Sequence, residues 1–178
     1  PAPLTTFIGR EREVAAIAAL LRDPVVRLLT LTGPGGAGKT RLGIVAAGAV
    51  GDHFPDGIVF VNLAPLGSSD LVVPSIAASL NLREHGDRLL HDVIVEFLAP
   101  RRFLLILDNF EHVLDAAPAI AALLGAAPLL TVLATSRIAL HLSGEHLYDV
   151  PSLGVPDPLG PADLDSVIQH ESVRLFQE

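Results

Sequence analysis

The sequence of 178 residues contains no cysteine. That absence excludes a disulfide framework, a zinc site built from thiolates and a cysteine nucleophile, and it fits a reducing, cytoplasmic location. Positive charge is also scarce, because 12 lysines and arginines stand against 20 aspartates and glutamates, which gives a net charge of -8. A surface of that sign repels a phosphate backbone, so we do not expect this segment itself to bind DNA or RNA.

Apolar side chains, in contrast, are abundant. Hydrophobic residues make up 50% of the chain and charged residues 18%, which predicts a compact domain with a sizeable core. The chain has no start methionine, no signal-peptide pattern and no cap on its last expected helix, so we expect a piece of a longer protein. Residues 116–136 carry no charge, but Pro118, Gly125 and Pro128 favour helix, turn and buried strand over a membrane span.

Strands and helices are expected to alternate along the chain. Apolar periodicity predicts helices at 9–22, 41–50, 70–82, 87–98 and 111–124, and strands at 26–32, 57–62, 103–107, 130–135 and 147–150. Asp70 and Asp87 are expected as helix N-caps. Strands that are apolar on both faces and alternate with helices indicate a parallel α/β sheet covered on both sides. We expect one domain over 1–152, followed by a linker and a truncated helix over 153–178.

A glycine-rich segment directly follows the first expected strand and precedes the next helix. It reads Gly33-Pro34-Gly35-Gly36-Ala37-Gly38-Lys39-Thr40, a match to G-x-x-x-x-G-K-[ST], with a plain glycine-rich turn as the alternative. Glycines let successive N–H groups face phosphate oxygens, and the helix N-terminus adds partial positive charge. Lys39, the only lysine, is expected on the β- and γ-phosphates, and the Thr40 hydroxyl on Mg²⁺. The expected nucleotide contacts here are Gly35, Gly36, Ala37, Gly38, Lys39, Thr40 and Arg41.

A second candidate is an apolar strand that delivers an acid at its carboxyl end. Residues 103–108 read FLLILD, and Asp108 is expected to hold the Mg²⁺ shell opposite Thr40, with helix capping as the alternative. The next residue, where one P-loop subclass has a catalytic carboxylate, is Asn109, which cannot accept a proton from water. Glu111 stays open as a substitute base, although an acid in the first turn of a helix also complements the helix dipole. We therefore expect slow hydrolysis.

Further candidates lie at another strand end and near the start of the chain. Arg137 closes the run Thr135-Ser136-Arg137, where an arginine can reach a γ-phosphate; an exposed surface arginine is the alternative. Phe7 and Ile8 can form a lid under a base or a hydrophobic staple on the following helix. The expected catalytic groups are Lys39, Asp108 and Arg137, and the expected metal ligands are Thr40 and Asp108.

Two polar clusters are weaker candidates. His141, Glu145 and His146 lack the H-E-x-x-H spacing of a zinc site, so we interpret them as loop residues at the surface. Arg101 and Arg102 precede the strand at 103–107 and are most simply its charged entrance, with a contact to a partner as the alternative.

Five segments in register resemble a known family. They are FIGRERE, LTGPGGAGKTRL, LLILDNFEHVLDAA, LATSR and SGEHLYDVPSL, and the resemblance that they carry covers nearly the whole chain, residues 7–176. In this order they are similar to the STAND class of signalling ATPases, above all to the ATPase module of large bacterial transcriptional regulators of the LuxR and SARP types, which is related to NB-ARC domains. Each segment alone is modest evidence, whereas five at these spacings are specific.

The resemblance implies a P-loop NTPase fold with strand order 5-1-4-3-2 and a bound ATP or ADP that acts as a conformational switch with Mg²⁺. It assigns Phe7, Ile8 and Arg10 to the adenine pocket and Arg137 to sensing of the γ-phosphate. It also implies that residues 153–178 begin a helical lid, and that lid, repeat and DNA-binding domains of the parent chain lie outside this segment. Nucleotide-dependent self-association belongs to the same expectation.

Three functions stay open at this point. The favoured one is a regulatory ATPase in which ATP or ADP sets the arrangement of neighbouring domains, with slow hydrolysis as the reset. A second is an AAA+-like ATPase that acts mechanically on DNA or protein, which the acidic charge and Asn109 both disfavour. A third is a nucleotide-binding scaffold without turnover.

Overall fold

The computed structural model describes residues 9–83 and 88–151. Within them the chain alternates between helices and strands. The strands are β1 (Leu28–Thr32), β2 (Gly57–Asn62), β3 (Phe103–Asp108), β4 (Leu130–Thr135) and β5 (Glu145–Asp149). The α-helices are α1 (Glu11–Arg22), α2 (Lys39–Gly48), α3 (Val72–Ser79), α4 (Leu90–Leu98) and α5 (Ala117–Ala126).

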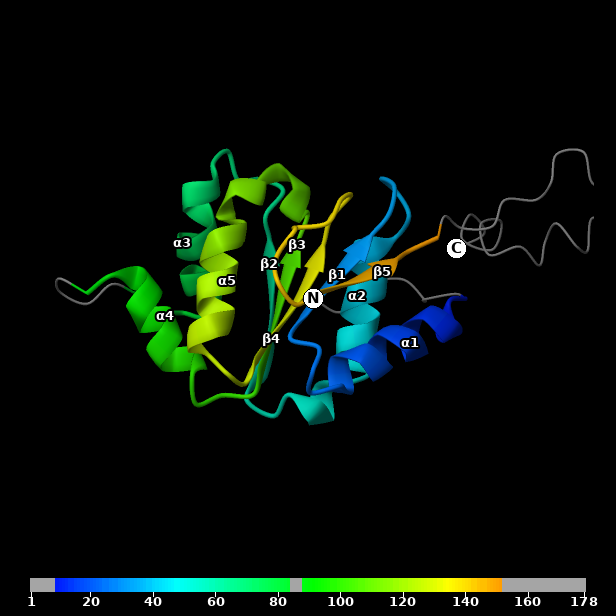
Figure 1. The fold of residues 1–178 in the computed structure, drawn as a ribbon, viewed down its shortest axis with the longest axis horizontal. Helices are drawn as coiled ribbons and strands as arrows, with labels where there is room; N and C mark the ends of the chain where they lie inside the picture. Colours follow the sequence, from blue (N-terminus) through cyan, green and yellow to red (C-terminus); the bar gives the residue numbers. More distant parts are fainter. Residues whose placement is uncertain (1–8, 84–87, 152–178) are drawn as a thin grey trace, which may run out of the picture.

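All strand pairs are parallel, and the five-stranded sheet has the order β2-β3-β4-β1-β5. This confirms the predicted order 5-1-4-3-2. Strand β4 therefore lies between β1, which leads into the glycine-rich loop, and β3, which ends in Asp108. The carboxyl ends of these three neighbouring strands meet at one edge of the sheet, drawn at the top of Figure 1.

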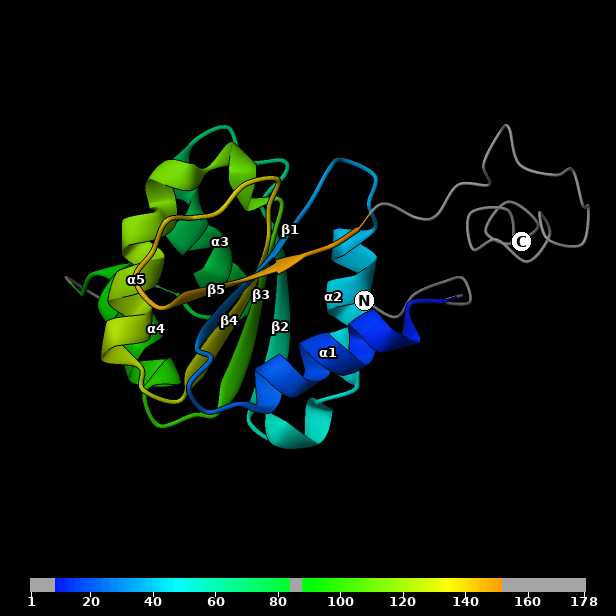
Figure 2. The same cartoon turned by 45° about the vertical axis from the view of Figure 1, so that its right-hand side comes forward.

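Helices cover both faces of the sheet. Helices α3, α4 and α5 lie on one face, and α1 and α2 lie on the other. Figure 1 and Figure 2 show this arrangement from two directions. Each face has its own apolar cluster, and neighbouring side chains of β3 divide between them. Leu105 and Leu107 pack toward α3, α4 and α5, whereas Leu104 and Ile106 pack toward α1 and α2. This explains why the strands are apolar on both faces.

The predicted helix at 111–124 is wrong in its first part. Two 3-10 turns, Phe110–His112 and Leu114–Ala116, precede α5. Pro118 lies in the first turn of α5. A proline has no N–H to donate, so it is tolerated in a first turn but would interrupt a helix that had begun at residue 111.

Other predicted boundaries shift for local reasons. Helix α2 begins at Lys39 because Gly38 is its N-cap. Asp70 is not a helix N-cap, because Ser68 caps the short 3-10 turn before α3 and its side chain accepts a bond from the Asp70 N–H. Asp87 and the expected linker and helix at 153–178 lie outside the described residues. Strand β5 starts two residues before the prediction, at the polar Glu145.

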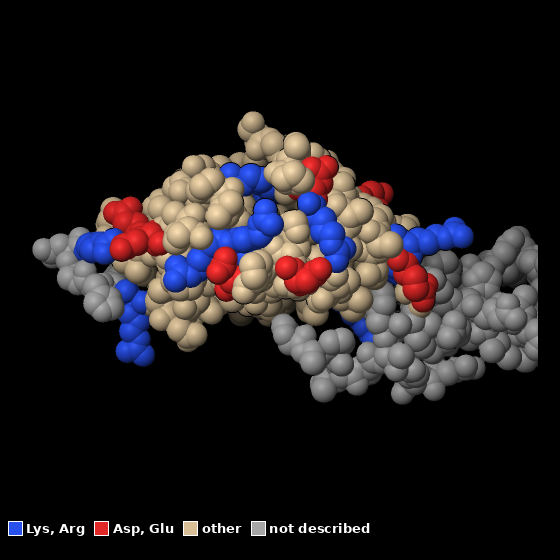
Figure 3. Space-filling model, turned by 90° about the horizontal axis from the view of Figure 1, so that it is seen from below, with Lys and Arg blue, Asp and Glu red and all other residues tan. Residues whose placement is uncertain are grey.

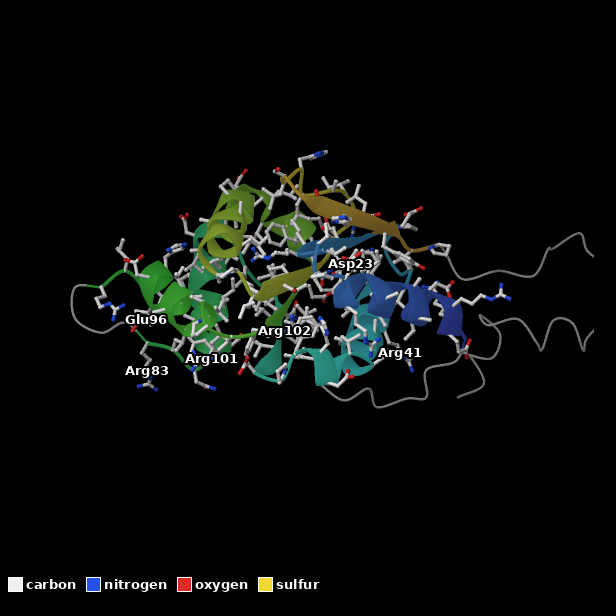
Figure 4. All side chains as sticks on the ribbon, turned by 60° about the horizontal axis from the view of Figure 1, so that its bottom comes forward. Asp23, Arg41, Arg83, Glu96, Arg101 and Arg102 are labelled. Carbon is white, nitrogen blue, oxygen red and sulfur yellow. The ribbon has the colours of Figure 1, made fainter. Side chains whose placement is uncertain are left out.

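The end of the sheet opposite the glycine-rich loop carries charges of both signs. Seen from below, blue and red side chains are interspersed over this surface (Figure 3). Arg101 and Arg102 lie where the chain enters β3 (Figure 4). The Arg101 guanidinium stacks 4.1 Å from the centre of the Phe97 ring, and the Arg102 N–H donates to Asp56 at 2.8 Å. Both residues directly precede β3, in agreement with their interpretation as its charged entrance, although the Arg102 contact is made by the backbone.

Residues 116–136 form α5, a turn and strand β4, and one side of the helix and the whole strand are buried. Among the described residues, no helix combines the length and apolar character needed to cross a bilayer.

Candidate nucleotide-binding site

The glycine-rich loop joins the end of β1 to the start of α2. Gly36 and Gly38 have φ values of 78° and 81°, a conformation that residues with a Cβ rarely adopt. These two positions turn the backbone tightly ahead of the helix. The glycine-rich loop thus has the sequence of a phosphate-binding loop and lies, like such loops, between a strand and a helix.

Lys39 is the first residue of α2 and its side chain lies within the loop. Only 8% of the residue is exposed. Its ammonium donates to the carbonyls of Gly33 at 2.8 Å and Pro34 at 2.9 Å. The only lysine of the chain is therefore folded back over the loop in which phosphate oxygens would be held.

Gly33 is needed for a contact that the motif does not reveal. Its φ is 142°, and a Cβ built on it would lie 2.7 Å from the Val150 carbonyl oxygen. Directly beside it, the Val150 N–H donates to the Thr32 carbonyl at 2.7 Å. The first glycine of the loop thus lets the chain leaving β5 pass against the end of β1.

Thr40 and Asp108 meet across the sheet edge, as the sequence predicts. The Thr40 hydroxyl donates to Asp108 Oδ1 at 2.7 Å. The same carboxylate oxygen accepts a second bond, from the Thr135 hydroxyl, at 2.5 Å. Thr135 Oγ1 in turn accepts the Asn109 N–H at 3.0 Å, so one chain of hydrogen bonds connects the first turn of α2 with the ends of β3 and β4.

Thr135 was not among the predicted site residues. It is 1% exposed and fixes both the Asp108 carboxylate and the backbone after it. The signal available in the sequence was its position two residues before Arg137 at the end of the neighbouring strand. That signal becomes useful only when the strand order is known.

The residues present fit Mg²⁺ together with a phosphorylated nucleotide. A hydroxyl and a carboxylate in contact offer oxygen ligands, which Mg²⁺ prefers, and this ion usually takes its other ligands from phosphates and water. Residues 9–83 and 88–151 contain no group of three or more His, Cys, Asp or Glu side chains that could hold a metal by themselves. That excludes His141, Glu145 and His146 as such a group; Glu145 instead accepts the Leu140 N–H at 2.8 Å.

Asn109 follows Asp108 with φ 61° and ψ 45°. Asparagine and aspartate tolerate this left-handed conformation better than most residues with a side chain. The turn redirects the chain into the first 3-10 turn, where Phe110 is fully buried. Asn109 is thus suited to its backbone conformation while lacking a carboxylate beside Asp108.

Arg137 lies over the glycine-rich loop. A Cβ built on Gly35 would lie 3.7 Å from Arg137 Nη2 and 3.9 Å from its Cζ. Nε of the same guanidinium pairs with Glu111 Oε1 at 3.2 Å. The predicted sensor arginine therefore reaches the loop from the end of β4, between β1 and β3.

Arg10 binds the loop from the other side. Its Nη1 donates to the Ala37 carbonyl at 2.7 Å and its Nη2 to the Pro151 carbonyl at 2.8 Å. Tyr148, on the same side, has a raised pKa because it is partly buried and close to the Glu13 charge, an effect that the Arg10 charge opposes. Phe7 and Ile8, the other residues assigned to the adenine pocket, lie outside the described residues.

The remaining predicted contacts belong to the same loop and the first turn of α2. Gly35, Gly36 and Gly38 are exposed, Ala37 is buried, and Arg41 follows Thr40 on the helix (Figure 4). The structure thus brings Lys39, Thr40, Asp108 and Arg137 to one sheet edge.

Comparison with known proteins was made for sequence and for structure. The model of the NB-ARC domain family matches residues 10–137. A Mycobacterium tuberculosis (strain ATCC 25618 / H37Rv) protein named as an HTH-type transcriptional regulator is 45% identical over 132 residues, which are 74% of this chain and 15% of that protein. The regulatory protein AfsR of Streptomyces griseus is 32% identical over 172 residues, 89% of this chain and 17% of AfsR.

Solved structures show the same fold at low sequence identity. Cdc6p from Pyrobaculum aerophilum superimposes with a TM-score of 0.61 at 20% identity, over 84% of this chain and 47% of that one. The STAND protein with a tetratricopeptide repeat sensor from Pyrococcus horikoshii gives 0.54 at 17% identity, over 99% of this chain and 28% of that one.

The matched segment is thus a small part of these regulators. The family match extends from Arg10, which binds the glycine-rich loop, to Arg137, which lies over it, and so includes the whole hydrogen-bonded edge of the sheet. The chain belongs to the NB-ARC family, the STAND-class P-loop domains that its sequence resembles, and its relatives include bacterial transcriptional regulators.

Proposed function

We propose that this domain is a switch that binds ATP or ADP with Mg²⁺ and hydrolyses ATP slowly. The observation that carries the proposal is the joint placement of Lys39, the Thr40–Asp108 pair and Arg137 around one glycine-rich loop. Backbone N–H groups of the loop and the Lys39 ammonium would bind the phosphates. Thr40 and Asp108 would hold Mg²⁺, which neutralises phosphate charge when bound.

The switch requires a group that distinguishes the two nucleotides. A ligand shifts a conformational equilibrium only through a difference in its interactions with the two states. Arg137 offers such a difference, because a guanidinium beyond the β-phosphate can bond a γ-phosphate oxygen and finds nothing comparable in ADP. Its position against Gly35 supports this role.

Slow hydrolysis follows from Asn109. In-line attack by water needs an acceptor that orients the water and takes its proton. The residue after Asp108 supplies an amide, which is no base, so turnover should stay below about 1 per minute. A long-lived ATP state suits a signal better than a motor.

In the whole protein we propose that the nucleotide state regulates transcription through neighbouring domains, in the bacterial cytoplasm. The relatives named as regulators are much longer than the matched segment, which leaves room for lid, repeat and DNA-binding domains. An AAA+-like mechanical ATPase remains the second candidate. The likeness to Cdc6p supports the fold alone, and charges of both signs on the underside offer no continuous basic path for DNA.

The proposal is tested by titration calorimetry of ATP and ADP with Mg²⁺ on the wild type and Lys39→Ala. Loss of the ammonium and its hydrogen bonds should cost on the order of 2 to 4 kcal/mol of binding free energy. Lys39→Arg serves as the matched control, because it keeps the charge but not the compact shape that fits the loop. Equal affinity of the wild type and Lys39→Ala would contradict nucleotide binding at this loop.

A further inference from the structure

The ion pair between Glu111 and Arg137 is asymmetric. The side chain of Arg137 is 62% exposed, whereas that of Glu111 is only 11% exposed. An exposed arginine on a flexible stem samples many rotamers unless a partner fixes it. The partner here comes from a rigid place, since Glu111 directly follows Phe110, which is fully buried.

The contact also fixes which part of the guanidinium is left for a ligand. Glu111 takes Nε, at 3.2 Å. The neighbouring atoms of the same group, Nη2 and Cζ, lie against Gly35 of the glycine-rich loop. Because a guanidinium is planar and rigid, holding Nε determines where the Nη N–H groups point.

From this geometry we infer that Glu111 is a positioning residue for Arg137. It holds the guanidinium over the loop so that the Nη groups are directed to the place of a γ-phosphate before the nucleotide arrives. The inference rests on the proposed function and deepens it, because it assigns the discrimination between ATP and ADP to a pair of residues. Glu111 acts through Arg137 and does not itself touch the nucleotide.

The second oxygen of Glu111 supports a fixed orientation. Oε2 is shielded from solvent, and no donor among the described residues lies within hydrogen-bond distance of it. Among residues 9–83 and 88–151, the carboxylate therefore has Arg137 as its ion-pair partner, through Oε1. A shielded carboxylate with one charged partner favours keeping that partner in place, because separation would leave the charge uncompensated.

The sign of the expected effect separates positioning from plain electrostatics. Removal of a negative charge near a triphosphate should by itself strengthen ATP binding, because a repulsion is lost. If Glu111 positions Arg137, Glu111→Gln should instead weaken binding of a non-hydrolysable ATP analogue. Asp115→Asn is the matched control, since Asp115 is an exposed acid on the next 3-10 turn.

The experiment is calorimetric titration of a non-hydrolysable ATP analogue and of ADP, with Mg²⁺, on the wild type and five variants. The variants are Glu111→Gln, Glu111→Ala, Arg137→Ala, Glu111→Ala with Arg137→Ala, and Asp115→Asn. We expect Glu111→Gln and Glu111→Ala to lose about threefold to tenfold in affinity for the analogue and less than about twofold for ADP. The double variant should bind no more weakly than Arg137→Ala, because the two residues act as a unit.

Two results of the titrations would overturn the inference. One is an equal loss for both nucleotides, which indicates a structural role for Glu111. The other is tighter binding of the analogue by Glu111→Gln than by the wild type, which is the direction expected from the loss of a negative charge alone. Failure of the proposed function would look different, because the wild type itself would then not bind the nucleotides or would not distinguish the ATP analogue from ADP.

Side-chain NMR tests the pair without any nucleotide. The Arg137 Nε–H resonance, assigned by its loss in Arg137→Ala, should shift and exchange faster with water in Glu111→Gln than in the wild type. An unchanged resonance in both Glu111 variants would contradict the positioning role whatever the affinities are.

Discussion

Arg10 donates to the Ala37 carbonyl at 2.7 Å, across 27 positions of sequence, and so joins the residue before α1 to the glycine-rich loop. The same guanidinium donates to Pro151 at 2.8 Å, just beyond β5. Arg10 is 6% exposed and has φ 63°, a strained value for arginine that these contacts help to hold. The resemblance assigned Arg10 to the adenine pocket, and the structure adds a contact with the glycine-rich loop.

The first prediction concerns this contact. Arg10→Ala should weaken ATP and ADP binding alike, by about tenfold each, because the loop loses a buried charge-assisted bond. Calorimetry with ATP, ADP and GTP checks it. A role through the loop predicts equal losses for adenine and guanine nucleotides. A loss confined to adenine nucleotides would contradict that role and place Arg10 in the base pocket instead.

The second prediction is that Arg137→Ala separates the two nucleotides. It should weaken binding of a non-hydrolysable ATP analogue about tenfold or more and leave ADP nearly unchanged, since a charge-assisted bond to the γ-phosphate is worth about 1.5 to 3 kcal/mol. Arg137→Lys keeps the charge without the planar fork, and its affinity for the analogue should fall between those of the wild type and Arg137→Ala. Equal losses for both nucleotides, or none, would make Arg137 structural and move the sensor elsewhere.

The third prediction concerns the rate of hydrolysis. Asn109→Asp should raise turnover about tenfold or more, because it supplies a carboxylate beside Asp108 and aspartate tolerates the left-handed backbone at this position. Phosphate release in single turnover measures it, with Asn109→Ala as the control that removes the amide without adding a base. Wild-type turnover of several per second would refute the premise of the prediction.

The fourth prediction uses two glycines to test the approach of β5 to the loop. Gly33→Ala should lower the free energy of unfolding by about 2 to 4 kcal/mol, because the new Cβ meets the Val150 carbonyl at 2.7 Å. Gly48→Ala is the control, since a Cβ there meets no described atom within 4 Å and alanine favours the helix. Chemical denaturation measures both. Comparable stability of the two variants would contradict a required close approach at Gly33.

Local patterns in the sequence predicted much of the site. The glycine spacing before Lys39 and Thr40 predicts a tight turn, because glycine adopts backbone conformations that residues with a Cβ rarely adopt. The apolar run before Asp108 predicts a buried strand with an acid at its end. Boundaries failed where a short-range signal competed with the periodic one. The expected helix at 111–124 begins only at Ala117, with Pro118 in its first turn, and the polar Glu145 hid the start of β5 from the apolar pattern.

The sequence by itself determined which residues could bind phosphate and metal, because that chemistry depends on residue type and on neighbours along the chain. The sequence also predicted that Asp108 faces Thr40, but only the tertiary structure decided which further side chains join this pair. The bond from Thr135 to Asp108, the pair of Arg137 with Glu111 and the passage of β5 against Gly33 all depend on β4 lying between β3 and β1, with β5 beyond β1. Strand order is set by packing among segments far apart in the chain, and no local pattern of residues encodes those distances.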